Sequence, residues 1–157
     1  MKRIHSVSLL AGIILSLFLA GSAFGAGEGH YYGVVESFGS GQLVVRTTQH
    51  STGNWKVGPT TKVEGSIARY DWVFVELGRG GHVALLRLEE RPTGRAGVVK
   101  EVHNRVLGVH SGNSLEHWNV TDATLGETAV DVGDEVSVKV YGNHNLAEIA
   151  VLKHGRR

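Results

Sequence analysis

The sequence contains no cysteine, and only two of its 157 residues are proline. Without cysteine the chain has no disulfide, no thiol nucleophile and no sulfur for haem or lipid attachment. It also lacks sustained helical periodicity and, apart from a glycine-rich segment at 25–29, low-complexity stretches. The fold therefore depends on a hydrophobic core, and we expect the chain beyond its first segment to be folded throughout.

The first residues have the pattern of a secretory signal peptide. Lys2 and Arg3 precede an apolar run of about 15 residues, and Ala23 and Gly25 supply the small residues of a cleavage site. The run is short against the roughly 20 residues that span a bilayer, which disfavours a transmembrane anchor. We predict a signal peptide over residues 1–25 and a mature protein in the periplasm or outside the cell, with no membrane span.

The chain has no excess of basic charge after cleavage. Removing Lys2 and Arg3 leaves 14 of the 16 basic residues, against 15 acidic ones. Proteins that hold polyanions through a general basic field need clustered Lys and Arg. The near-neutral mature chain therefore disfavours nucleic acid as a partner.

The most informative feature is an internal repeat, in which four blocks of the first half recur in the same order in the second half. The offset is 63 or 64 residues throughout. YGVVESFGSGQLVVRT matches AGVVKEVHNRVLGVHS, WKVGPTTKV matches WNVTDATLG, DWVFVELG matches DEVSVKVY, and HVALLRLEE matches NLAEIAVLK. Four ordered matches indicate duplication of one unit.

Each copy has about five short alternating segments separated by turn residues, which predicts all-β structure. Closing such strands into a small barrel removes unpaired edges. We expect barrels over residues 30–91 and 96–154, with RPTGR at 91–95 as the linker. A unit of about 60 residues is marginal alone, so the two copies should bury surface against each other.

The repeated pattern has a G-V-V strand, a second strand, a short third strand, an acidic residue opening a V-x-V-x-V strand, and a last apolar strand beginning with Ala. It resembles an uncharacterised family of exported bacterial β-barrel domains that are OB-like in shape and often in tandem. The resemblance covers residues 32–91 and 96–153. It implies two five-stranded OB-like barrels outside the cytoplasm, and it transfers no catalytic residues.

Comparing the copies separates core from surface. In DEVSVKV, Val136, Val138 and Val140 form one face, and the other face is polar. The aligned core face of the first copy is Val73, Val75 and Leu77. On the last strand the expected core residues are Ala84, Leu86 and Leu88 in the first copy and Ala147, Ile149 and Val151 in the second.

By this alignment, Trp72, Phe74 and Leu85 lie outside the first barrel, where the second carries Glu135, Ser137 and Glu148. Contiguous exposed apolar surface marks an interface or a binding groove. Three interpretations stay open: the second barrel covers this surface, a protein partner or a second copy binds it, or it stacks ligand bases or sugars as OB-folds do.

Histidine is frequent, and His103, His110 and His117 recur every seven residues. Imidazole binds copper, zinc and nickel, so these three with His144 are candidate metal ligands. The spacing argues against such a site, because an interval of seven places strand neighbours on opposite faces. A periplasmic histidine-based metal-binding protein is therefore the alternative function, and no other cofactor is predicted.

Trp55 and Trp118 are in register between the copies, which favours a structural role for both. We find no nucleophile elbow, no phosphate loop and no suitably placed pair of acids. The sequence predicts an exported non-enzymatic binding or structural module that uses Trp72, Phe74 and Leu85 for protein contacts. A second alternative is an OB-like module that binds oligosaccharide or single-stranded nucleic acid.

Overall fold

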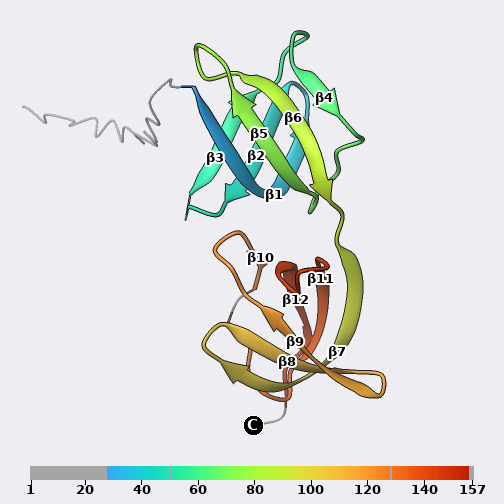
Figure 1. Cartoon of the computed structure of the whole chain (residues 1–157). Helices are drawn as coiled ribbons and strands as arrows, with labels where there is room; N and C mark the ends of the chain where they lie inside the picture. The colour runs from blue at the N-terminus through green and yellow to red at the C-terminus, as the bar shows by residue number, and fades with distance from the viewer. Residues whose placement is uncertain (1–27, 50, 128, 156–157) are drawn as a thin grey trace, which may run out of the picture.

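Twelve β-strands and no helix make up the described part of the chain, residues 28–49, 51–127 and 129–155 of a computed structural model (Figure 1). The expected signal peptide, residues 1–25, lies outside this part. Within the described ranges there is no helix long and apolar enough to cross a membrane. The strands form two six-stranded sheets, and each sheet curls into a small barrel.

The first barrel is a three-strand meander followed by three further strands, with the order β3-β2-β1-β5-β6-β4. β4 runs parallel to β6, and every other pair is antiparallel. Its strands are β1 (Gly29–Gly39), β2 (Gln42–Thr47), β3 (Thr52–Lys56), β4 (Lys62–Glu64), β5 (Trp72–Leu77) and β6 (Val83–Glu90). This arrangement is an OB-like barrel.

The second barrel repeats this order six strands later, as β9-β8-β7-β11-β12-β10, again with one parallel pair, β10 and β12. Its strands are β7 (Thr93–His103), β8 (Val106–Ser111), β9 (Ser114–Asn119), β10 (Leu125–Gly126), β11 (Glu135–Val140) and β12 (Leu146–Lys153). The predicted all-β tandem of OB-like barrels is therefore confirmed. Each copy has one strand more than the five predicted, because the short β4 and β10 pair separately.

The linker between the barrels is shorter than the sequence predicts. β6 ends at Glu90 and β7 begins at Thr93, which leaves only Arg91 and Pro92 between them. Residues 93–95 pair with residues 138–140 of β11 and so belong to the second sheet. The short connection limits how far the barrels can separate.

The repeated G-V-V motif has a steric cause. A Cβ atom at Gly33 would lie 2.2 Å from the carbonyl oxygen of Arg46, and one at Gly97 would lie 2.3 Å from that of His110. Neither separation is possible for a side chain, so both first strands need glycine where the second strand crosses them.

The predicted core faces of the third pair of matched blocks are confirmed. Val73, Val75 and Leu77 lie in the first core and are at most 5% exposed. Val136, Val138 and Val140 lie in the second core.

The prediction for the alanines of the last strands is wrong. A bulge pairs Glu76 with Leu85 and then Leu77 with Val83, so Ala84 is skipped and Val83 enters the core. The matching bulge brings Leu146 into the second core and turns Ala147 toward the first barrel. A bulge shifts the inward face by one residue, which simple alternation does not anticipate.

An aspartate lies just before β5 in the first copy and just before β11 in the second. Asp71 accepts a hydrogen bond from the backbone N–H of Ala68 at 2.8 Å, and Asp134 accepts one from that of Asp131 at 3.0 Å. Both carboxylates are buried, and each has a basic neighbour at the same repeat position, Arg91 at 3.7 Å and His154 at 3.5 Å. The acidic residue of the repeat therefore closes a turn.

The two barrels pack through a third apolar cluster. Its buried members are Val34, Ala123, Leu125, Tyr141 and Ala147, with Tyr70 and Trp72 packed against them. We call this set the seam. Figure 1 shows the second barrel below the first, joined to it by the segment between β6 and β7. The mutual burial expected for two small units is therefore present.

Candidate functional site

The side chain of Trp72 packs against the seam. The Trp72 ring lies edge-on to that of Tyr141 in the second barrel, with 5.8 Å between ring centroids, and is half-buried. Around it, the Tyr70 hydroxyl donates to a carboxylate oxygen of Glu148 at 2.5 Å. This hydrogen bond, followed by burial, raises the pKa of Tyr70. Three interpretations of the apolar surface were open. For Trp72 the first of them holds, because the second barrel covers this side chain.

Phe74 and Leu85 do not extend that contact. Phe74 is only 9% exposed, because the rings of His30 and Tyr32 and the guanidinium of Arg87 cover it. Leu85 is half-buried and pairs with Glu76 and Lys62 on the neighbouring strands. The three predicted contact residues therefore have three different surroundings.

An aromatic row remains on the outer face of the first barrel. Tyr32, Phe74 and Arg87 lie opposite one another on β1, β5 and β6, and Tyr32 is 44% exposed. The matching row of the second barrel is Ala96, Ser137 and Ala150. The aromatic row is therefore specific to the first copy.

The four candidate metal-ligating histidines, His103, His110, His117 and His144, are all exposed and not gathered around one point. His117 contacts Glu101 at 3.0 Å, and His103 contacts Asn104. Among the described residues no three His, Cys, Asp or Glu side chains cluster as metal ligands would.

Trp55 and Trp118 both pack against the core of their own barrel, but to different depths. Trp118 is 1% exposed within the second core. Trp55 is partly buried against the first core and lies 5.0 Å from the ring of Tyr31. Their surroundings are those of packing residues.

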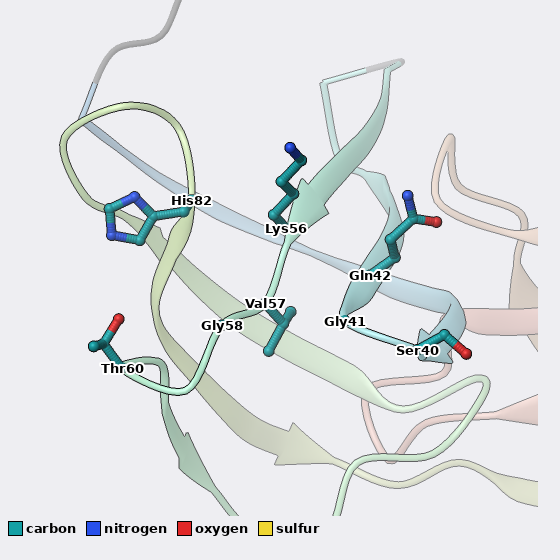
Figure 2. Close-up of a pocket in the computed structure, with 8 residues that line it drawn as sticks. All are labelled: Ser40, Gly41, Gln42, Lys56, Val57, Gly58, Thr60 and His82. Carbon is teal, nitrogen blue, oxygen red and sulfur yellow. The ribbon is translucent and has the colours of Figure 1, made fainter.

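A groove of about 540 Å³ opens in the first barrel where β3 ends, β6 begins and the β1–β2 turn comes close (Figure 2). Its lining residues are Ser40, Gly41, Gln42, Lys56, Val57, Gly58, Thr60 and His82. Figure 2 shows the segment 56–58 in the middle, with His82 and Thr60 to one side and Ser40 and Gln42 to the other. The volume lies within the range of small-molecule sites, roughly 300–1,000 Å³.

The second barrel is bridged at the corresponding place. Asn119 at the end of β9 forms a parallel β-bridge with Asn145 just before β12, and its side-chain amide donates to the Asn145 side-chain oxygen at 3.2 Å. The repeat places Lys56 and His82 at these two positions in the first barrel. No bridge joins them in the described residues of that barrel. The two copies thus differ in this bridge, although a crevice also opens in the second barrel beside Val120 and Thr121, which align with Val57 and Gly58.

The charge of the groove differs from that of the protein as a whole. Its lining includes Lys56 and His82 and no carboxylate. In the described chain, neither of these two side chains forms a salt bridge. Hydroxyl and amide groups of Ser40, Gln42 and Thr60 supply the remaining polar atoms. The groove can donate hydrogen bonds to a ligand from several directions.

A second crevice lies between the barrels and is less suited to a ligand. It has a volume of about 450 Å³ and includes Arg46 of β2 together with Arg105 and Asp122 of the second barrel. Arg46 already pairs with Glu36 at 2.8 Å, and Arg105 with Asp122 at 2.5 Å. A ligand there would have to compete with these ion pairs.

Sequence reasoning missed the groove, although a signal for it was present. Lys56 aligns with Asn119 and His82 with Asn145 within two of the four matched blocks. The candidate contact surface was predicted only from positions where the first copy has an apolar residue and the second a polar one. A pair of basic residues replacing a pair of asparagines at facing strand ends is the signal that could have located the site.

Comparisons with known proteins add little beyond this geometry. No family model and no curated protein matches the chain. A solved structure similar to it is drosophila Unr CSD456, with a TM-score of 0.34 and 15% sequence identity over 80% of this chain and 62% of that chain. This chain therefore spans less than two thirds of the length of that structure.

Proposed function

We propose that the protein is an exported, non-enzymatic binding module whose first barrel binds a small ligand in the open groove and whose second barrel supports it. The observation that carries this proposal is the difference between the copies at the Lys56/Asn119 and His82/Asn145 positions. Function resides in sites grafted on folds, so a difference between two copies of one fold indicates where a site lies.

The groove chemistry favours binding over catalysis. His82 is the one imidazole among the lining residues, and no lining carboxylate orients it as a general base. Ser40 and Thr60 have no base among the lining groups other than His82 and Lys56. The proposal therefore assigns these groups to ligand recognition.

Export and family membership are parts of the same proposal. They are supported by the signal-peptide pattern of residues 1–25 and by the resemblance of both repeats to exported OB-like domains. Periplasmic or extracellular location is tested by fractionating cells that express the full-length chain.

The binding role is tested by NMR on the mature protein, residues 26–157. Amide shifts are recorded with a panel of small sugars, sugar acids, sugar phosphates and amino acids. We expect shifts to cluster at residues 40–42, 56–60 and 82, and not at 119–123 and 145. The matched variant Lys56→Asn with His82→Asn gives the first barrel the closing residues of the second. Shifts confined to other surfaces, or unchanged in this variant, would refute the proposal.

The aromatic row supports a second candidate function, self-association of the chain through protein contacts. Aromatic and Arg residues are the groups that dominate protein interfaces, and Tyr32, Phe74 and Arg87 adjoin one another only in the first copy. Sedimentation velocity over a concentration series tests it, with Tyr32→Ser as the variant. A dimer lost in this variant supports the role, and a monomer at every concentration rejects it.

A further inference from the structure

We propose that the groove of the first barrel selects ligands that carry an oxyanion, a carboxylate or a phosphate, on a hydroxyl-bearing body such as a sugar. This inference rests on the proposed binding function and narrows it to a ligand class. It follows from the charge, the hydrogen-bonding groups and the repeat comparison of the groove.

The charge of the groove is the first argument. Lys56 and His82 line the same opening, and its eight lining residues include no acidic group. Elsewhere on the first barrel, cations have partners: Arg46 contacts Glu36, Lys62 contacts Glu64 and Arg87 contacts Glu89. A cation without a carboxylate partner in a groove is free to pair with a ligand anion, and charge-assisted hydrogen bonds are stronger than neutral ones.

The other lining groups complete the recognition surface. The hydroxyls of Ser40 and Thr60 both donate and accept hydrogen bonds, and the Gln42 amide does the same. These groups match the hydroxyls of a polyol better than the face of an aromatic ring. No aromatic side chain lines the groove, so stacking of a base is not its mode of binding.

The repeat supplies an internal control for the charge. At the two positions that meet across the opening, the second barrel has Asn119 and Asn145, which bond to each other. The first barrel has Lys56 and His82 at these positions, and no bridge joins them in its described residues. An oxyanion bound in the groove would accept a charge-assisted hydrogen bond from the Lys56 ammonium, which the second barrel replaces with the neutral amide of Asn119.

The test compares three probes with one sugar ring: glucose, glucuronate and glucose 6-phosphate. Each is titrated into the mature protein at constant ionic strength, and amide shifts of Gly41, Val57, Gly58 and His82 are followed. We expect the anionic probes to bind at least tenfold more tightly than glucose. Binding of glucuronate alone identifies a carboxylate ligand, and binding of glucose 6-phosphate alone identifies a phosphate ligand.

Variants separate charge from shape. Lys56→Gln with His82→Gln removes both basic side chains and should weaken binding of the anions at least tenfold, leaving glucose unchanged. Arg79→Gln lies in the same turn but outside the lining, and it should change nothing. Both groove residues are exposed, so the spectra should show an intact fold.

Failure of this inference is distinguishable from failure of the binding function. Glucose binding as tightly as the anions, with shifts in the groove, would overturn the charge argument and leave the binding module intact. No groove shift with any of the three probes would also overturn the inference. The wider probe panel then decides the binding function by itself.

Discussion

The hydroxyl of Tyr141 donates a 2.5 Å hydrogen bond to the backbone carbonyl oxygen of Tyr70 across the seam. Burial, with the nearby charges of Asp71 and Glu90, raises the pKa of Tyr141, so the hydroxyl stays protonated and can donate. Tyr70 itself has a φ of 75°, at the repeat position where the second barrel has Gly133 with a φ of 98°. A non-glycine residue is strained there, and the seam contacts hold it in place.

The first prediction concerns this bond. Tyr141→Phe should lower the free energy of unfolding by about 1 to 2 kcal/mol, because the Tyr70 carbonyl loses its partner in a mostly buried place. Urea unfolding followed by circular dichroism measures it. Tyr32→Phe, on an exposed ring, is the matched control and should be neutral. Equal midpoints for the two variants would show that this hydrogen bond does not stabilise the fold.

The second prediction compares two glycines of β7. Gly97→Ala should destabilise the protein by about 1 to 3 kcal/mol, because its Cβ would meet the His110 carbonyl oxygen and the Val109 side chain. Gly94→Ala should be tolerated, since no atom lies within 4 Å of its Cβ position. Thermal melts of both variants provide the measurement. Similar loss in both would contradict the steric account of the G-V-V motif.

The third prediction is a pH dependence at Asp134. Hydrogen bonds from the backbone N–H groups of Asp131 and Gly155 lower the pKa of this carboxyl from its ordinary 3.8. Its ionised form therefore stabilises the fold above that pH, and the contribution is lost as the pH falls through the lowered pKa.

Asp134→Asn should accordingly reduce the urea midpoint at neutral pH, and the difference from the original protein should shrink below about pH 4. Glu135→Gln replaces the adjacent exposed carboxylate and serves as control. A midpoint difference that stays constant down to about pH 2 would exclude a role for the ionised carboxylate.

The fourth prediction distinguishes the two tryptophans in register. Trp118→Ala should cost about 3 to 5 kcal/mol, because the ring is almost completely buried in the second core. Trp55→Ala should cost roughly half as much, since its ring is only partly buried. Denaturant unfolding gives both values. A larger cost at Trp55 would place the more important packing in the first barrel.

Much of the fold was accessible from the sequence because strand periodicity is local. The alternation in DEVSVKV identified the inward face of β11, and the repeat transferred that face to β5, where Val73 and Val75 are fully buried. The alanines of the last strands were misplaced because a bulge depends on the pairing partner, which alternation within one strand does not contain.

The candidate site was less accessible for a related reason. Lys56 and His82 are separated in the sequence and have no motif between them. Whether facing strand ends close with a bridge or leave a groove depends on how the sheet curls. The asparagine pair of the second copy makes the difference visible only once both barrels are compared in space.

The amino-acid sequence by itself determined the duplicated unit, its strand pattern and the inward faces of its central strands, because these follow from periodicity and turn residues along the chain. Only the tertiary structure decided what covers Trp72 and which barrel has a bridge between its strand ends. Those outcomes depend on contacts between segments far apart in sequence, where burial and strand pairing compete across the whole fold.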